Sequence, residues 1–180
     1  NVKVVPKLKP SIIPIPEMIV KVVVNQMLSK QAATSIYQRL DIERRKRKLE
    51  GTWLLDRRVM RKCGLSNSKC KTIREFSKKY LRNSSHYDNW YKIDFDELKY
   101  DVQNHWGMSD WSASIIGIFY FAHEDVFPIG DGSIGRATSL FNNYLKNEHG
   151  LKSQFDPNNA KPYRSYLALY MWKALDEGVI

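Results

Sequence analysis

The segment of the sequence best suited to chemistry is a helix–hairpin–helix candidate at residues 95–121. Its turn, Trp106-Gly107-Met108-Ser109-Asp110, contains a glycine and directly precedes an apolar stretch with helical character. Such a turn points backbone N–H groups outward beside a helix N-terminus, where they and the helix dipole bind a phosphate without reading base sequence. Any pair of antiparallel helices can contain a glycine turn, so the motif alone is a weak signal.

A carboxylate, that of Asp131, follows the second helix of this candidate. Gly130 and Gly132 frame it, and the hydrophobic run Val126-Phe127-Pro128-Ile129 precedes it. An aspartate before a helix that begins near a serine is most often a helix cap. The residues by themselves therefore favour a capping role over a catalytic one.

The positive charge is concentrated in one third of the chain. Residues 39–82 contain 16 Lys/Arg and 5 Asp/Glu, whereas the rest contains 13 and 14, for a formal net charge of +10. Such concentration favours a surface that faces a polyanion, most often nucleic acid. A solubilising face on exposed helices is the alternative. If the first interpretation holds, Arg44, Arg45 and Arg47 are expected to meet phosphates of any duplex.

The elements that position these residues are predicted to be helices. Residues 1–17, rich in proline, valine and lysine, predict an extended arm. Apolar residues then recur at helical spacing from Ile19 to Leu40, although Ser29 interrupts the stripe. Further helices are expected over 53–60, after an N-cap at Ser66, after the capping-box pattern at 94–97, over 111–121, from an N-cap at Ser133 to a stop at Gly150, and from Pro162 to near Gly178. The pattern predicts seven or eight helices, no strands, and one all-α domain over residues 18–180.

Composition excludes several classes of protein. A chain of 180 residues and 21.1 kDa suits one domain with a sizeable core. No apolar run approaches the ~18–20 residues that cross a bilayer, so no membrane partner is expected. The two cysteines, Cys63 and Cys70, cannot form a disulfide framework or a four-cysteine cluster. We therefore expect an intracellular protein in a reducing compartment.

The stretch from Trp106 to Ala137 resembles the signature region of the helix–hairpin–helix (HhH-GPD) DNA glycosylases, and within them the 3-methyladenine glycosylases. Three further segments, at residues 26–33, 64–77 and 161–172, resemble the family's segments in order and spacing. The resemblance covers about residues 18–177. The residues of the signature region that stand on the family's pattern are Gly107, Trp111, Ala113, Asp125, Val126, Phe127, Pro128 and Asp131.

The resemblance implies a bilobal helical fold, with Asp131 as the catalytic aspartate in the loop after the hairpin. Cleavage of an N-glycosidic bond builds positive charge on the deoxyribose, and a fixed carboxylate stabilises that charge or deprotonates a water. The implied function is excision of alkylated purines, of the 3-methyladenine and 7-methylguanine type, from double-stranded DNA. Asp125, by contrast, is expected to be structural.

Several residues are implied to bind the substrate. Trp172 aligns with a pocket tryptophan of the family, and an indole face attracts a cationic methylpurine. Trp111, Tyr37, Trp53 and Gln26 are the other candidates for the base pocket, with core packing the alternative for the aromatic residues. Because the target base must leave the duplex, a wedge must fill the gap, and Met27 with Leu28 matches that position. The hairpin residues expected to contact phosphate are Gly107, Met108, Ser109 and Trp111.

The chain departs from the family pattern at the hairpin. Ser109 replaces the second hairpin glycine, and His105-Trp106 replaces leucine-proline, which changes the shape of the phosphate contact. Bifunctional relatives carry a hairpin lysine that forms a Schiff base, and Trp111 occupies that position here. The resemblance therefore implies a monofunctional enzyme that acts as a monomer without an iron–sulfur cluster or a catalytic metal; a monovalent cation at the hairpin is compatible with DNA binding.

Two functions of different classes remain open from the sequence. The first is the monofunctional glycosylase that leaves an abasic site. The second is a non-catalytic helix–hairpin–helix module that binds duplex or distorted DNA. Both place the protein with DNA, in a bacterial cytoplasm or a eukaryotic nucleus, and base release from methylated DNA separates them.

Overall fold

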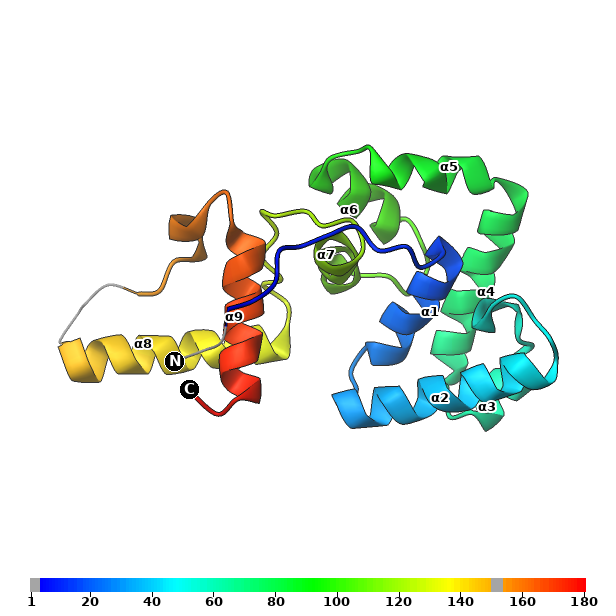
Figure 1. The fold of residues 1–180 in the computed structure, drawn as a ribbon, viewed down its shortest axis with the longest axis horizontal. Helices are drawn as coiled ribbons and strands as arrows, with labels where there is room; N and C mark the ends of the chain where they lie inside the picture. Colours follow the sequence, from blue (N-terminus) through cyan, green and yellow to red (C-terminus); the bar gives the residue numbers. More distant parts are fainter. Residues whose placement is uncertain (1–3, 150–153) are drawn as a thin grey trace.

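The computed structural model describes residues 4–149 and 154–180, and within these ranges it contains helices and no strand (Figure 1). None of the described helices is long and apolar enough to span a membrane. The α-helices of these ranges are α1 (Ile15–Asn25), α2 (Lys30–Lys46), α3 (Arg57–Lys62), α4 (Asn67–Arg82), α5 (Ser84–Asp88), α6 (Phe95–Gln103), α7 (Asp110–Phe119), α8 (Gly132–His149) and α9 (Arg164–Asp176), with short 3-10 helices at Thr52–Leu54, Asn89–Tyr91 and Pro157–Ala160. The all-α prediction is confirmed.

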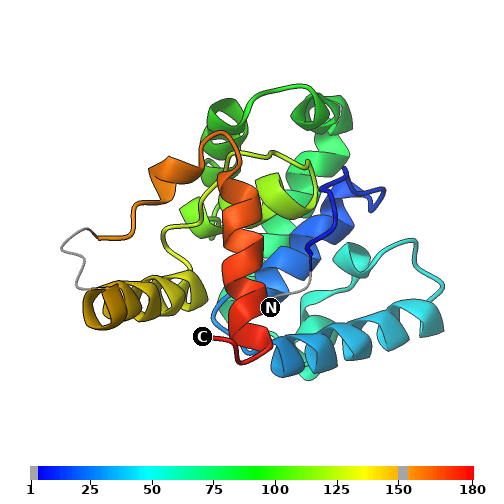
Figure 2. The same ribbon diagram turned by 60° about the vertical axis from the view of Figure 1, so that its left-hand side comes forward.

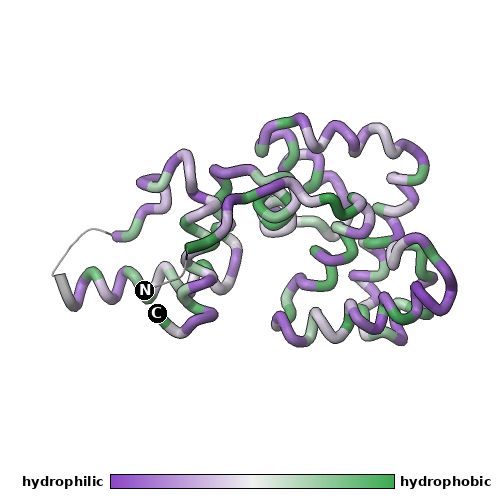
Figure 3. The backbone as a smooth tube through the Cα atoms, in the orientation of Figure 1, coloured by the Kyte–Doolittle hydropathy of each residue, from purple (hydrophilic) through white to green (hydrophobic). Residues whose placement is uncertain are grey.

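The helices form two lobes, each with its own core. Helices α1–α7 build the large lobe, in which α1 is almost wholly buried against α4, α2 and α7. Helix α7, seen end-on in the middle of Figure 3, is largely hydrophobic. Helices α8 and α9 build the small lobe around Ile134, Ala137, Ala168 and Met171. The bilobal arrangement implied by the resemblance is therefore present.

An extended arm, residues 4–14, crosses from the small lobe to the large one (Figures 1 and 2). The backbone N–H of Leu8 donates to the Tyr166 hydroxyl of α9 at 3.2 Å, and that of Ser11 donates to the Tyr120 carbonyl at 2.8 Å. The arm is shorter than the predicted 1–17 because α1 begins at Ile15. A proline in the first turn of a helix is tolerated, so Pro16 does not delay the helix.

The helical pattern from Ile19 to Leu40 belongs to two helices rather than one. Helix α1 ends at Asn25, Met27 adopts a left-handed φ of 54°, and α2 begins at Lys30. Ser29, which interrupts the apolar stripe in the sequence, is the N-cap of α2, and its hydroxyl accepts from the Ala32 N–H. The interruption therefore marks a turn.

The predicted helix caps are present at α4 and α6 but not at α8. Ser66 and Asp94 cap α4 and α6 as expected, accepting from the N–H groups three residues further on. Ser133 was the wrong choice for α8, because the Asp131 carboxylate accepts from the Ser133 and Ile134 N–H groups. Helix α9 begins at Arg164, two residues after the predicted Pro162, and the predicted stop at Gly150 lies outside the described residues.

The side chain of His105, just before the hairpin turn, is buried among Phe76, Tyr87 and Trp90, and its Nδ1 has no hydrogen-bond partner among the described residues. Burial lowers the pKa of His105 from 6.5 to about 4. The unfolded chain therefore binds a proton that the folded chain does not bind between these two values.

We expect the free energy of unfolding to fall as the pH is lowered from about 6.5 to about 4. Urea unfolding at a series of pH values measures this dependence. The His105→Phe variant should flatten it, leaving a remainder from His123, whose pKa burial also lowers. An unchanged slope in that variant would show that His105 is not responsible.

Candidate active site

Asp131 lies where the two lobes meet, between one tryptophan from each. Trp111, in the first turn of α7, donates from Nε1 to Asp131 Oδ2 at 2.8 Å. Trp172, on α9, donates from Nε1 to Oδ1 at 3.0 Å. The large lobe therefore holds one oxygen of the carboxylate and the small lobe holds the other.

The same carboxylate caps α8. Oδ1 accepts from the Ser133 N–H at 2.9 Å and the Ile134 N–H at 3.0 Å, in addition to the Trp172 indole. A carboxylate has about four acceptor positions on its two oxygens, so Oδ2, with a single indole donor, retains capacity for another partner. The sequence presents capping and catalysis as alternatives, but this geometry allows both, because the cap uses Oδ1 and leaves Oδ2 with one donor.

Asp125 fixes the linker that carries Asp131. Its Oδ1 and Oδ2 accept from Arg164 Nε at 2.7 Å and Nη2 at 2.9 Å, at the start of α9. The Arg164 guanidinium lowers the pKa of Asp125 below its usual value. The Ser165 hydroxyl adds a bond to the Val126 backbone N–H, which is buried. This supports the structural role predicted for Asp125.

A cavity of about 570 Å³ opens beside Asp131, between the lobes. Its walls come from the arm, from α1, from α7 and from α9. The rings of Phe119 and Trp172 lie 5.6 Å apart at 31°, which gives the cavity an aromatic wall. The residues that line it include Leu28, Trp111, Phe119, Asp131 and Trp172. Apolar walls with a few polar groups are typical of a small-molecule or base pocket.

Two lysines line this cavity, and neither comes from the hairpin. Lys21, on α1, lies with its Nζ 5.2 Å from the centre of the Tyr37 ring. Lys30 reaches Asp176 of the small lobe at 3.8 Å. Lys99 of α6, far from Trp111 in sequence, pairs with Asp110 because the two hairpin helices are antiparallel. Lys99 therefore lies beside the hairpin, but it does not line the cavity.

The hairpin turn is built on a glycine that no other residue replaces freely. Gly107 has a φ of +77°, and a Cβ there would lie 2.2 Å from Thr72 Oγ1 of α4. The Met108 N–H donates to the His105 carbonyl and its side chain is buried, so Met108 forms the turn rather than a phosphate contact. Ser109 is the N-cap residue of α7 but provides no side-chain cap. The first N–H groups of a helix have no acceptor within the helix, and those of α7 are not capped by the Ser109 side chain either.

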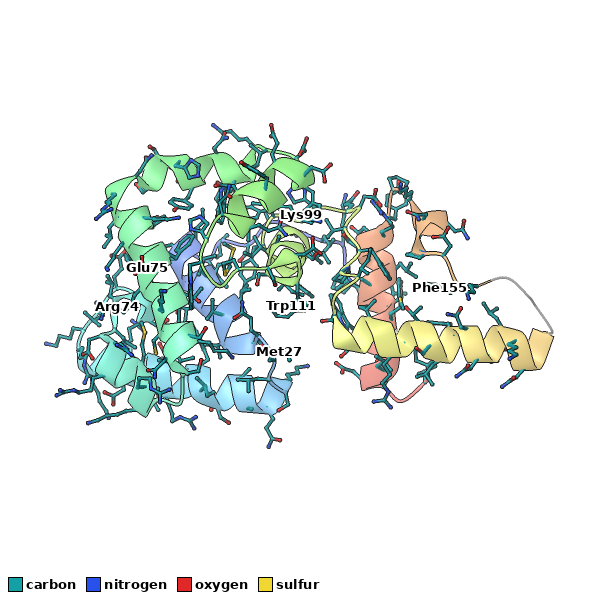
Figure 4. The ribbon with its side chains drawn as sticks, turned by 180° about the vertical axis from the view of Figure 1, so that it is seen from behind. Met27, Arg74, Glu75, Lys99, Trp111 and Phe155 are labelled. Carbon is teal, nitrogen blue, oxygen red and sulfur yellow. The ribbon has the colours of Figure 1, made fainter. Side chains whose placement is uncertain are left out.

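The wedge candidates occupy the turn between α1 and α2. The Met27 side chain is 100% exposed, and Leu28 borders the cavity. Figure 4 shows Met27 and Trp111 on the side of the large lobe that faces the small lobe, whereas Arg74 and Glu75 lie on α4 away from it. The predicted positions of the wedge residues are thus compatible with insertion into a duplex beside the cavity.

Two polar side chains hold the wedge turn. Lys69 of α4 donates from Nζ to the carbonyls of Val24 at 2.9 Å and Gln26 at 2.7 Å, and desolvation lowers its pKa. Gln26 donates from Nε2 to the carbonyl of Gly107 at 3.0 Å and to Ser112 Oγ at 3.1 Å. The wedge turn and the hairpin are therefore one connected unit. Sequence reasoning missed Lys69, although it lies in the segment 64–77 that carries part of the resemblance.

Three of the predicted pocket residues lie elsewhere. Gln26 joins the wedge turn to the hairpin instead of lining the cavity. Tyr37 donates its hydroxyl to Glu17 Oε1 behind α1, where burial and that carboxylate raise its pKa. Trp53 is 8% exposed and packs edge-on against Tyr80, in the core of the large lobe. For both aromatic residues the core-packing alternative is the correct one.

The basic cluster at the end of α2 is largely paired within its own helix. Arg44 and Arg45 bond Asp41 at 2.8 and 2.7 Å, while Lys46 and Arg47 pair with Glu43. These cations lower the pKa of Asp41 and Glu43. Much of the charge of this cluster is therefore already neutralised locally.

Most of the chain matches a known family of DNA repair proteins. The family model described as "HhH-GPD superfamily base excision DNA repair protein" matches residues 20–156. No curated protein sequence matches the chain.

Solved structures with the same fold are those of glycosylases. A 3-methyladenine DNA glycosylase from Schizosaccharomyces pombe in complex with abasic DNA is 20% identical, with a TM-score of 0.67 over 97% of this chain and 85% of that one. A DNA-3-methyladenine glycosidase from Bacillus halodurans is 22% identical, with a TM-score of 0.66 over 93% and 78%. A 3-methyladenine DNA glycosylase from Archaeoglobus fulgidus is 18% identical, with a TM-score of 0.64 over 88% and 57%. At these identities the likeness is one of fold, whereas the family match spans most of the sequence: the chain belongs to the HhH-GPD superfamily of base excision DNA repair proteins.

Proposed function

We propose that the protein is a monofunctional DNA glycosylase that removes alkylated purines from double-stranded DNA. The observation that carries the proposal is the Asp131 carboxylate, held by Trp111 and Trp172 at the wall of an aromatic cavity between the lobes. The fold it shares with three 3-methyladenine glycosylases supports the same activity.

Different residues of the chain bind the DNA backbone and fill the gap that the extruded nucleotide leaves. The first turn of α7 and Gly107 bind the backbone of the damaged strand, since unpaired helix N–H groups donate hydrogen bonds to phosphate oxygens. Met27 enters the gap that the extruded nucleotide leaves, and Leu28 borders the cavity that receives the base. The wedge is held in place by Lys69 and Gln26.

Within the cavity, the aromatic wall and the carboxylate act on different parts of the nucleotide. The indole of Trp172 and the ring of Phe119 offer faces to a methylated purine, whose positive charge favours stacking on an aromatic ring. The Asp131 carboxylate stabilises the positive charge that develops on the deoxyribose as the bond to the base breaks. Its Oδ2 also orients or deprotonates the attacking water.

The product is expected to be an intact strand with an abasic site. A tryptophan nitrogen cannot form an imine with the sugar, and Trp111 occupies the lysine position of bifunctional relatives. Lys21 and Lys30, which line the cavity, are bound to the Tyr37 ring and Asp176. Incubation of a 7-methylguanine duplex should therefore release the base, and the strand should break only after alkali or heat.

Borohydride added during turnover tests the monofunctional part separately. We expect no trapped protein–DNA adduct. A reproducible adduct that the Lys21→Gln variant loses, but the Lys99→Gln variant keeps, would identify Lys21 as a nucleophile and place the protein in the bifunctional class.

We further propose that the enzyme works as an intracellular monomer without a cofactor. The sequence has two cysteines rather than the four of a cluster, and both are buried, with burial raising the pKa of each thiol. We therefore expect a chelator to leave the rate of base release unchanged.

A further inference from the structure

A basic groove lies at the outer end of the large lobe, away from the cavity. It is shallow and wide open to solvent, with a volume of about 580 Å³ between α3 and the start of α4, and it is lined by Arg57, Arg58, Arg61, Lys62 and Asn67. The lining contains four cationic side chains and no carboxylate, and all four are exposed.

These cations differ from those of α2 in having no acidic partner. Within the described ranges, no ion pair involves Arg57, Arg58, Arg61 or Lys62, whereas Arg44–Arg47 pair with Asp41 and Glu43. The contacts that do exist inside the groove shape it: Arg57 donates to Asn67 Oδ1 at 3.1 Å and Arg61 to the Leu65 carbonyl at 2.5 Å. Part of the uncompensated positive charge of the basic segment is therefore found in this groove. Arg74 and Arg82 of the same segment have no ion pair among the described residues either, and they lie outside the groove.

The groove adjoins the wedge turn on the side opposite to the cavity. Asn67, at its edge, lies in the same first turn of α4 as Lys69, whose Nζ bonds the Gln26 carbonyl beside Met27. On the other side of the turn, Asn25 and Leu28 line the cavity. In Figure 1, α2 begins on the side of the large lobe that faces α9, where Lys30 reaches Asp176, and α3 lies by the second half of α2, away from the small lobe. The cavity and the groove therefore lie on different sides of the wedge turn.

We propose that this groove binds phosphates of the strand complementary to the damaged one. The proposal rests on the proposed function, because it assumes that a damaged nucleotide enters the cavity with Met27 in the duplex. The damaged strand is then held between the hairpin and Asp131. The complementary strand passes the far side of the wedge, where the groove presents guanidinium groups suited to phosphate oxygens.

The variant Arg57→Gln/Arg58→Gln tests this assignment while leaving Arg61, which bonds a backbone carbonyl, in place. Affinity is measured on a duplex with one abasic site at several salt concentrations. We expect a loss of roughly 10-fold at moderate salt and a salt slope smaller by about 1–2. The matched control is Arg82→Gln/Lys92→Gln, which removes the same charge near α5, at the other end of α4, and should change the affinity by less than about 2-fold. The conservative Arg57→Lys/Arg58→Lys variant should retain most of the affinity.

Neutral methylphosphonates identify the strand. When they are placed in the complementary strand beside the lesion, the wild type and the Arg57→Gln/Arg58→Gln variant should bind with nearly the same affinity. When they are placed in the damaged strand, their loss of affinity should add to that of the variant. The proposal is wrong if the two effects add in both strands, or if the control pair weakens binding as much as the groove pair. An unaltered affinity of the groove variant for DNA would also overturn the proposal, and would indicate that the groove binds an acidic protein surface instead. Base release by the wild type is assayed separately, so failure of the proposed function is recognised independently.

Discussion

The Asp131→Asn variant should lose base release by roughly 10³-fold in single-turnover experiments while its affinity for an abasic duplex stays close to that of the wild type. The asparagine oxygen can keep the α8 cap and the Trp172 bond at the position of Oδ1. Its amide group then meets the Trp111 N–H, a donor, where Oδ2 had accepted at 2.8 Å. The variant therefore loses both the negative charge and one of the bonds that orient the side chain.

Asp125→Asn is the matched control for this experiment. Asp125 lies in the same linker, but it pairs with Arg164 and does not line the cavity. We expect a lower thermal stability and a base-release rate within a few-fold of the wild type. Equal losses of rate in the two variants would show that the linker, rather than the carboxylate at residue 131, limits the reaction.

The Gly107→Ala variant should weaken DNA binding by about 10- to 100-fold, since it distorts the backbone that faces the phosphates. A φ of +77° costs an L-residue about 1 kcal/mol. The new Cβ would also lie 2.2 Å from Thr72 Oγ1, so the turn or α4 must move. Affinity for an abasic duplex and the midpoint of urea unfolding should both fall.

A second substitution separates these two effects. Thr72→Ala removes the hydroxyl that blocks the new Cβ, so Gly107→Ala/Thr72→Ala should recover part of the lost affinity and retain the cost of the positive φ. Thr72→Ala alone loses a hydrogen bond to the Ser68 carbonyl and should bind DNA nearly as well as the wild type. If the double variant binds no better than Gly107→Ala, steric conflict with Thr72 is not the cause.

Much of the fold follows from local signals in the sequence. Ser66 and Asp94 identified the starts of α4 and α6, because these residue types are common N-caps. Each side chain accepts from the backbone N–H three residues further on, so the signal is local. The arm was predictable because prolines exclude helix before Ile15. The break between α1 and α2 has one local signal, Ser29, which interrupts the apolar stripe and caps α2, whereas the left-handed φ of Met27 has none.

The candidate site was predictable where the resemblance fixed single positions, as at Trp111, Asp131 and Trp172. It was not predictable for Tyr37 and Trp53, because an aromatic residue at helical spacing serves a core and a pocket equally well. Lys69 was missed because its ligands are carbonyls of α1, which no side-chain pattern reveals. Only the packed structure shows that the Asp131 carboxylate, which caps α8, also lines the cavity.

The most direct test of the proposed glycosylase activity is chromatography of bases released from DNA treated with a methylating agent. We expect the wild-type protein to release 3-methyladenine or 7-methylguanine in amounts that match the abasic sites formed, and the Asp131→Asn variant to release almost none. A folded wild-type protein that binds the methylated duplex tightly and releases no base would contradict this account, and would make the chain a non-catalytic helix–hairpin–helix module.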